Sequence, residues 1–425
     1  MRASWPERLE PRNKTAKRDS NVISKKISVE ELQFGMYVTQ LDRPWTDTPF
    51  LFQGFLLREP EQLETLRKFC KDVYIDVERS ELPDATRRAP LTIKAPGMPA
   101  GIRQVEHIER VTVEAELPRA ATSYETSQSA WESMVASLSR GSELDAAAVQ
   151  GAVKDMSSSI MRNPDALVLF SALKERGGYF LGRAMNTSIY MIMFARFLGM
   201  TPEDIERAGM VGLLQDIGML DVPDDVLSKT GPLSPDEQKL VRGHVERGVE
   251  ILHKTAGMPL EVAELVMLHH ERHDGSGYPR GLGSTDLGTI GACAGIIDTF
   301  SAMTSKRPYA EAMAPSNALG MLHKWRDKVF HPLLIEEFIR CIGVFPVGSV
   351  VELNNGEVGI VISQNVAKRL QPRVMVVRDE KGNPIRPQKL IDLSRSPKIS
   401  EEETYRIRRT LEYGRSGVGL KDVML

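Results

Sequence analysis

A chain of 425 residues is too long for one ordinary hydrophobic core, so its length predicts two or three domains. A formal net charge of −2 disfavours nucleic acid as a partner, because binding to a phosphate backbone normally needs a strong basic surplus. No apolar run approaches the roughly 18 residues that span a bilayer, and the three widely spaced cysteines form no CxxC pair. We therefore expect a cytoplasmic protein with reduced thiols and no membrane segment.

The N-terminal part of the chain is expected to form a tail, a small domain and a linker. Residues 1–26 carry eight basic side chains without the apolar segment of a signal peptide, and we expect them to be disordered. Residues 27–80 have the pattern of a small α/β domain. Five prolines interrupt the linker that follows, residues 81–121, and leave no room for long elements. Within the small domain, the expected elements are strands at 34–41, 50–57 and 73–77 and a helix at 60–70.

Residues 122–345 are expected to form a helical domain, because strong helix start signals recur there. The runs TPED at 201–204 and SPDE at 234–237 each place a hydroxyl cap before a proline and two acids. Gly343 is expected to end the last long helix. The first helical stretch, 122–153, either packs as an ordinary helix or connects two copies of the chain in a homodimer.

Residues 346–396 return to a β pattern and predict a small barrel-like appendage. An Asn-Asn-Gly run at 354–356 is a turn signal between the first two strands. The last residues, 397–425, are expected to be an exposed tail. The expected strands lie at 349–353, 358–362 and 374–377. Together these patterns predict a mainly α fold, with a small α/β domain in front of the helical domain and a small β appendage behind it.

Histidine and aspartate side chains cluster in the helical part of the chain in a pattern that indicates a metal site. Five of the eight histidines fall within thirty residues. An apolar run predicts a helix that delivers His269 and His270 into a glycine loop, and His244 is expected inside an amphipathic helix with Leu240 and Gly248 on one face. Each such residue alone is more often hydrogen-bonded in a core, but imidazoles and carboxylates from four helices together suit Fe, Mn, Zn or a similar divalent ion. The candidate ligands are Asp216, His244, His269, His270 and Asp298.

One segment carries a specific family signature. Residues 269–282, HHERHDGSGYPRGL, resemble the signature of the HD-GYP family of phosphohydrolases. Residues 216–218 and His244 lie where that family has its HD motif and its next histidine, and residues 298–309 are similar to its last metal-binding helix. The resemblance covers residues 170–345 and implies an all-helical bundle of the HD superfamily.

The resemblance also implies a function. HD-GYP proteins are bacterial signalling proteins whose substrate is cyclic di-GMP, which they open to linear pGpG and in some members cut on to GMP. Residues 27–80 resemble the uncharacterised domain often found ahead of such domains. A diguanylate cyclase (GGDEF) domain, docked through the Tyr278 loop, is a further implied partner.

By the same resemblance, individual residues are expected to have defined roles. Asp216 is expected to be both a metal ligand and the catalytic residue, and Arg307 to contact a phosphate of the dinucleotide through a charge-assisted bond. The remaining expected metal ligands are His244, His269, His270 and Asp298, and the remaining expected substrate contacts are Gly277, Tyr278 and Pro279.

The chain departs from the family pattern at several positions. The histidine before the aspartate of the HD motif is Gln215 here. The histidine expected on an earlier helix is Arg183, which cannot bind a metal because a guanidinium stays protonated. The other departures are Met219 for a lysine that contacts phosphate, Ser301 for the second acid of the last motif, and Ala310 for a basic residue.

These departures remove two of the four ligands of the first metal position and leave all four of the second. We therefore predict one divalent ion rather than two, and slow or absent hydrolysis, because a two-metal site stabilises both the attacking and the leaving oxygen. The fixed charge of Arg183 near Asp216 or Asp298 is predicted to replace a cation.

The sequence leaves more than one function open. The chain is either a metal-dependent phosphodiesterase with weakened turnover or a catalytically inactive module that senses cyclic di-GMP or docks another protein. A purely structural scaffold is disfavoured, because a scaffold would not need the five candidate ligands together.

Overall fold

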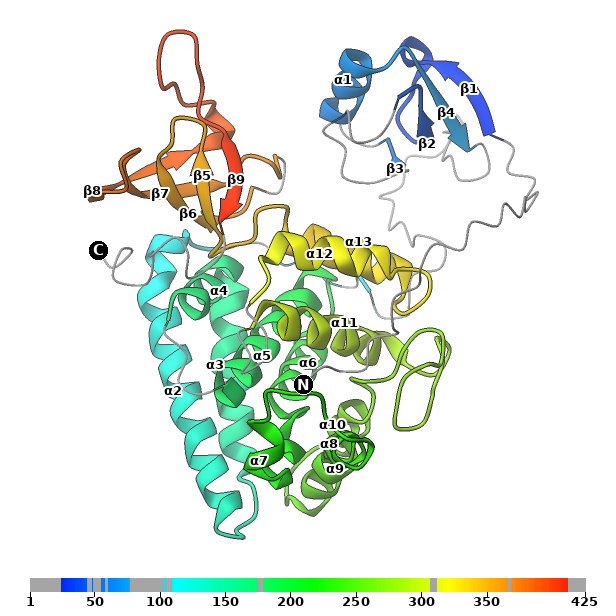
Figure 1. Cartoon of the computed structure of the whole chain (residues 1–425), viewed down its shortest axis with the longest axis vertical. Coiled ribbons are helices and arrows are strands. Elements are labelled where there is room, and N and C mark those ends of the chain that lie inside the picture. Colours follow the sequence, from blue (N-terminus) through cyan, green and yellow to red (C-terminus); the bar gives the residue numbers. More distant parts are fainter. Residues whose placement is uncertain are drawn as a thin grey trace. The chain divides into compact units, whose positions relative to one another are not determined.

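Figure 1 shows the computed structural model of the whole chain. The structure describes residues 24–43, 48, 55–57, 60–76, 102, 103, 105, 107, 109–174, 179–305, 312–365 and 368–411. Most of the expected N-terminal tail, the linker up to residue 101 and Arg307 lie outside the described residues. The chain divides into two compact units, one within Ser4–Lys94 and one within Ala95–Leu425, and each is described by itself.

The N-terminal unit combines an antiparallel sheet with one helix, as the sequence predicts. Its elements are β1 (Ser24–Ser28), η1 (Val29–Glu31), β2 (Tyr37–Leu41), β3 (Phe55–Leu56), α1 (Pro60–Phe69) and β4 (Asp72–Asp76). The strand order is β1-β4-β2-β3, and Val38, Leu57 and Leu66 are fully buried in its core. Strand β1 begins inside the expected tail, because Ser24 already pairs with Asp76 of β4.

The second unit contains the predicted helical domain. Its elements are α2 (Val113–Ser139), α3 (Ala146–Arg162), α4 (Pro164–Leu173), α5 (Tyr179–Phe197), α6 (Pro202–Leu214), η3 (Ile217–Asp221), α7 (Asp224–Leu227), α8 (Pro235–Arg242), α9 (His244–Lys254), α10 (Leu260–Val266), α11 (Gly288–Thr304), α12 (Pro315–Lys324) and α13 (Pro332–Ile342). Helix α5 packs against α3, α4, α6, α11 and α13 and runs through the interior of the domain in Figure 1. Met185, Ile189 and Phe194 of α5 are almost completely buried, so this helix forms the centre of the core.

The predicted helix signals are confirmed where the boundary is set by local hydrogen bonds. Thr201 caps α6, and Ser234 and Glu237 form a complete capping box at α8. Gly343, at φ 79°, ends α13. The expected linker does not extend to residue 121, because α2 starts at Val113 and contains Pro118. The cost of a proline inside a helix is offset by the packing of α2 along α3 and α4.

Two further local expectations are wrong, and both concern candidate ligands. His244 does not lie inside one long helix: the chain breaks at Gly243, and His244 is the first residue of α9. Helix α10 ends at Val266, so His269 and His270 lie in the turn that follows it rather than on the helix. The candidate ligands therefore sit at element ends, where the backbone can change direction towards a shared point.

The C-terminal β appendage is a five-stranded antiparallel sheet in the order β8-β7-β6-β5-β9. Its strands are β5 (Val350–Leu353), β6 (Val358–Ser363), β7 (Arg373–Arg378), β8 (Pro384–Asp392) and β9 (Ile407–Leu411). Strand β9 corrects the expectation of an exposed tail from residue 397, because it pairs with β5. The Ile-Arg-Arg-Thr-Leu run lacks strict alternation, and Glu352 of β5 holds it through ion pairs with Arg408 and Arg409.

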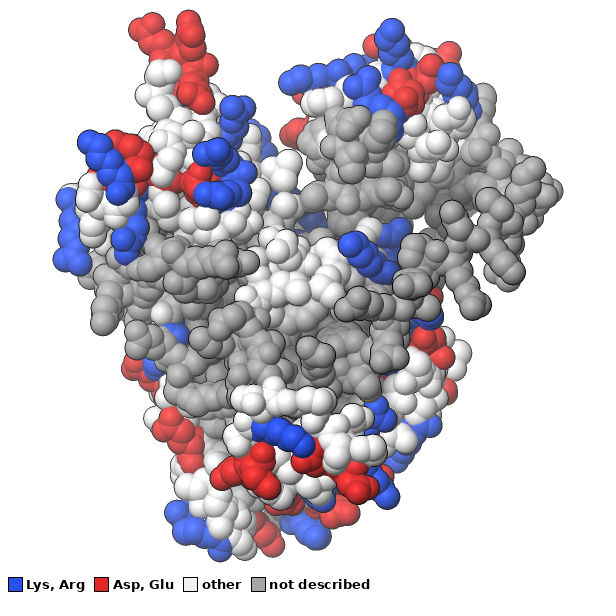
Figure 2. Space-filling view, viewed as in Figure 1, with Lys and Arg blue, Asp and Glu red and all other residues white. Residues whose placement is uncertain are grey.

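No helix of the described residues is both long and apolar enough to cross a membrane. On the face drawn in Figure 2, acidic and basic side chains of the described residues are interspersed. This mixture agrees with the small net charge of the chain.

A buried carboxylate joins the β appendage to the helical domain and predicts a pH-dependent stability. Asp165 of α4 accepts a hydrogen bond from the backbone N–H of Gln364, 2.9 Å away, and burial raises the pKa of Asp165 to about 6. Because this pKa lies above that of the unfolded chain, the ionised group destabilises the fold as pH rises from about 4 to about 6.

We expect Asp165→Asn, which keeps an acceptor for Gln364, to raise the free energy of unfolding by about 1–3 kcal/mol at pH 8 and by much less at pH 4.5. Urea unfolding at both pH values measures this, and an equal difference at the two would contradict it.

Candidate functional site

The local fold around Gly218 brings Asp216 next to His244. Asp216 follows the end of α6, and the short η3 turn after it packs against α9. A Cβ on Gly218 would lie 2.1 Å from the carbonyl oxygen of His244 and 2.6 Å from the nitrogen of Gly248. Only glycine permits this approach of two backbones, so the glycine after the aspartate is a packing requirement of the site.

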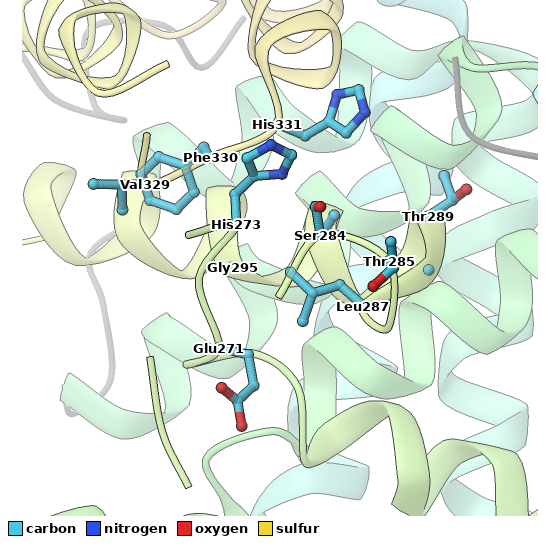
Figure 3. A pocket seen from close by; sticks show the side chains of 12 residues that line it. Glu271, His273, Ser284, Thr285, Leu287, Thr289, Gly295, Val329, Phe330 and His331 are labelled. Atoms are coloured by element: carbon cyan, nitrogen blue, oxygen red, sulfur yellow. The ribbon is translucent and has the colours of Figure 1, made fainter. Parts of the chain in front are cut away.

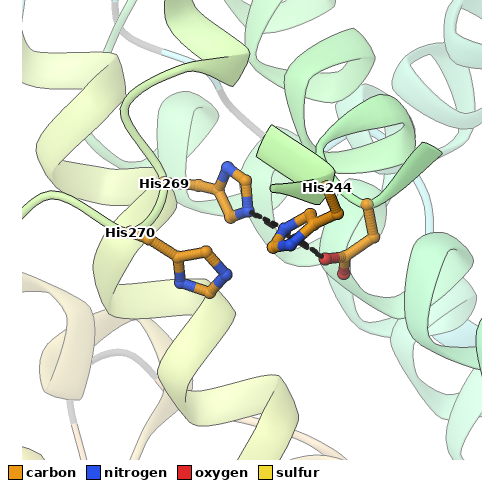
Figure 4. A group of neighbouring side chains, drawn as sticks. His244, His269 and His270 are labelled. Atoms are coloured by element: carbon orange, nitrogen blue, oxygen red, sulfur yellow. Dashed lines mark hydrogen bonds and ion pairs between the residues drawn. The ribbon is translucent and has the colours of Figure 1, made fainter. Parts of the chain in front are cut away.

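Four of the five candidate ligands meet in one group. One ligand atom from each of Asp216, His244, His269 and His270 lies within 4.8 Å of the others. The Nε2 atoms of His244 and His269 are 3.1 Å apart, and the Oδ1 atom of Asp216 is 3.5 Å from the first and 4.0 Å from the second. Figure 4 shows the three imidazole rings turned towards a common space.

Hydrogen bonds to the backbone set the tautomers of two of these histidines. The Nδ1 of His244 donates to the carbonyl of Val241 at 2.6 Å, and the Nδ1 of His269 donates to that of Val266 at 2.7 Å. Since a carbonyl can only accept, each Nδ1 carries a proton, and the two Nε2 atoms are left facing each other. Two nitrogens bound to one divalent ion at about 2.0–2.1 Å are separated by about 3.0–3.4 Å, so the observed spacing fits a shared ion.

Burial keeps the histidines in the state that binds metal. Burial, with the charge of His269, lowers the pKa of His244 to about 4 and that of His270 well below its usual value. Both rings are therefore neutral at pH 7. Neutral imidazoles around an ionised carboxylate are a donor set that Fe, Mn or Zn accepts.

Asp298, the fifth candidate, lies beside this group rather than in it. Its Oδ2 is 3.5 Å from Nδ1 of His270, and its Oδ1 accepts a hydrogen bond from Nε2 of Gln215 at 2.9 Å. Arg183 donates to the same Oδ1 and, through Nε, to Oδ2 of Asp216 at 2.5 Å. Burial alone would raise the pKa of Asp216, but Arg183 and His244 outweigh it and hold that pKa well below its usual value.

The segment with the family signature covers one side of the group. The Tyr278 ring stacks on His270, with ring centroids 4.7 Å apart and planes at 26°, and the guanidinium carbon of Arg242 lies 4.9 Å from the Tyr278 centroid. A Cβ on Gly277 would lie 2.4 Å from Cα of Glu271, so the loop needs a glycine there for packing. Pro279 follows Tyr278 through a cis peptide bond.

Sequence reasoning missed the side chain that holds this loop. Glu271 is 2% exposed, and its two carboxylate oxygens accept from the backbone N–H groups of Arg280, at 2.7 Å, and Leu282, at 2.9 Å. An acidic residue directly after two histidines offers no local signal for such a role. Met219, expected as a missing phosphate contact, is buried with other apolar side chains.

A separate cavity of about 510 Å³ lies on the other side of the same segment. Figure 3 shows His273 and His331 together at one end of it and Glu271 at the other. The rings of the two histidines have centroids 5.3 Å apart. The lining residues that the structure describes include none of the five candidate ligands, so this cavity is distinct from the histidine group.

Comparisons with known proteins agree with this geometry. Residues 24–149 match a domain of unknown function (DUF3391), residues 168–333 match the HD domain, and residues 350–400 match a KOW domain associated with the HD domain. The chain is 32% identical over 375 residues to the cyclic di-GMP phosphodiesterase PA4108 of Pseudomonas aeruginosa, covering 88% of this chain and 89% of that protein.

Two shorter matches fall within the same family of relatives. The cyclic di-GMP phosphodiesterase response regulator RpfG of Xanthomonas campestris is 35% identical over 35% of this chain and 39% of its own. A cyclic di-GMP phosphodiesterase of Thermotoga maritima is 32% identical over 39% of this chain and 43% of its own. With a curated relative aligned along most of its length and the HD domain matched across its helical part, the chain belongs to the HD-GYP family of cyclic di-GMP phosphodiesterases.

Proposed function

We propose that the chain binds cyclic di-GMP and hydrolyses it slowly with a single divalent ion, Fe, Mn or a similar metal. The observation that carries this proposal is the group of Asp216, His244, His269 and His270, whose ligand atoms lie within 4.8 Å of one another, with the Nε2 atoms of His244 and His269 at the 3.1 Å spacing that fits a shared ion. A bound divalent ion supplies an acidified water and polarises a phosphoryl oxygen.

The protein's own residues position the ion and the substrate in this proposal. Asp216 and the three imidazoles hold the ion, with Asp216 as the catalytic carboxylate. Tyr278, flanked by Gly277 and Pro279, stacks its ring on His270, and burial raises the pKa of its phenol, which therefore stays protonated and can donate to a phosphate. Arg307 is proposed as a phosphate contact from outside the described residues.

Hydrolysis is proposed to be slow because one stabilising cation is absent. Losing a single donor to the transition state commonly costs roughly a hundred- to a thousandfold in rate. The second candidate function is a cyclic di-GMP sensor without turnover. It is favoured by the position of Arg183, which bridges Asp216 and Asp298. Docking of a GGDEF domain, a homodimer and a cytoplasmic location stay predictions.

The test combines metal analysis, a binding titration and a turnover assay on the purified full chain with Mn²⁺ or Fe²⁺ supplied. We expect about one ion per chain, binding of cyclic di-GMP, and pGpG formed slowly. Tight binding without pGpG would replace the slow enzyme by the sensor. Metal-loaded protein that neither binds nor cleaves cyclic di-GMP would contradict both.

A further inference from the structure

The two oxygens of Asp216 face different partners. Oδ1 faces the Nε2 atoms of His244 and His269, at 3.5 and 4.0 Å. Oδ2 faces away from them and accepts the Nε hydrogen of Arg183 at 2.5 Å. The carboxylate thus lies between two cation positions, one lined by imidazoles and one filled by a guanidinium.

A second carboxylate completes the position that the guanidinium fills. Arg183 donates through Nη2 to Oδ1 of Asp298, so one side chain bridges Asp216 and Asp298. All three are nearly buried, with side-chain exposures of 9% for Arg183, 11% for Asp216 and 5% for Asp298. Two buried carboxylates held this close need a cation between them, and here the cation is part of the chain.

Gln215 belongs to the same arrangement. Its Nε2 donates to the Oδ1 of Asp298 that Arg183 also contacts, at 2.9 Å. Its Oε1 is buried and has no hydrogen-bond partner within the described part of the chain. An amide N–H and a guanidinium therefore surround Oδ1 of Asp298. Both groups donate hydrogen bonds, whereas a metal ion at this position would need nitrogen or oxygen atoms with free lone pairs.

Charge balance favours a single ion beside this pair. Among the groups that Arg183 joins directly, two carboxylates and one guanidinium leave a net charge of −1. One divalent ion at the imidazoles brings this to +1. A second would bring it to +3 in a nearly buried site, with an ion and a guanidinium competing for the same two oxygens.

We propose that Arg183 is a built-in substitute for a second metal ion: its guanidinium permanently fills the position between Asp216 and Asp298 and makes the centre mononuclear. Arg183 is thereby a positioning residue, which turns Oδ1 of Asp216 towards the imidazoles and holds Asp298 beside His270. This inference rests on the proposed function, because it presupposes an ion at the histidine group.

The inference predicts that histidines in place of these two side chains create a second metal site. In the variant Arg183→His/Gln215→His, the two carboxylates lose their internal cation and gain two neutral nitrogen ligands. We expect metal analysis to find about one ion per chain in the wild type and about two in the variant. With Mn²⁺, electron paramagnetic resonance should show the six-line signal of an isolated ion in the wild type and the broadened signal of a coupled pair in the variant.

A matched control makes the same substitutions elsewhere. Gln128→His/Arg140→His places one histidine at a partly exposed position of α2 and one at its exposed C-cap, and should keep about one ion per chain. Arg183→Lys, which retains a cation, should also keep about one. Circular dichroism and thermal melting establish that each variant is folded.

The outcomes separate this inference from the proposed function. A wild-type chain without any bound ion overturns the proposed function and the inference with it. Two ions in the wild type overturn the role of Arg183 together with the single-ion part of the proposed function, whereas one ion with an isolated Mn²⁺ signal in a folded Arg183→His/Gln215→His variant overturns only the role of Arg183. The wild-type stoichiometry decides the question by itself if the double variant fails to fold.

Discussion

Replacing His244 with alanine is expected to remove the bound metal ion and to reduce cyclic di-GMP turnover to background. His244 supplies one of the two Nε2 atoms that face each other at 3.1 Å, and it also contacts Asp216. Changing a group that merely orients a metal ligand typically costs ten- to a hundredfold in metal affinity, about 1.4–2.7 kcal/mol, and removing a ligand itself should cost more. Metal content after dialysis and pGpG formation measure the effect.

The same helix provides the control for this variant. His253 is exposed in the last turn of α9, and His253→Ala should leave metal content, turnover and melting temperature unchanged. Metal retained at the wild-type level in His244→Ala would show that the ion does not bind at the histidine group. A loss of metal in both variants would point to a general effect on α9 instead.

Replacing Glu271 with alanine is expected to release the Tyr278 loop while leaving the metal in place. The substitution removes both acceptors of the Arg280 and Leu282 N–H groups, which lie at 2.7 and 2.9 Å. Leaving two partly buried donors unpaired should cost roughly 2–4 kcal/mol. Because Tyr278 then loses its stacked position on His270, we expect cyclic di-GMP to bind at least about tenfold more weakly, or about 1.4 kcal/mol.

Two variants calibrate this effect. Glu271→Gln keeps one acceptor oxygen and should show a smaller loss of binding and stability, whereas Glu264→Ala, at an exposed position of α10, should show none. Calorimetric titration and thermal melting, together with metal analysis, distinguish the loop from the ion. Unchanged dinucleotide binding in Glu271→Ala would remove the loop from the proposed binding site.

Local sequence signals predicted the features that depend on neighbouring residues. The hydroxyl caps of α6 and α8 and the glycine that ends α13 act through hydrogen bonds and backbone angles within a few residues. The mainly α fold with two small flanking β-containing parts follows from hydrophobic periodicity in the same way. Strand β9 escaped prediction because its stability comes from pairing with β5, more than fifty residues earlier.

The candidate site shows the same difference between what local sequence signals predict and what long-range contacts decide. The sequence by itself determined which residue types are present: the imidazoles of His244, His269 and His270, and an arginine where a metal ligand would be expected. Only the tertiary structure decided that Asp216 divides its oxygens between the histidines and Arg183. It also decided that Oδ1 of Asp298 contacts Arg183 and Gln215 while its Oδ2 lies beside His270. The physical reason is that charge pairing between buried groups depends on distances of a few ångströms, and these are set by the packing of α5, α6, α9 and α11 rather than by spacing along the chain.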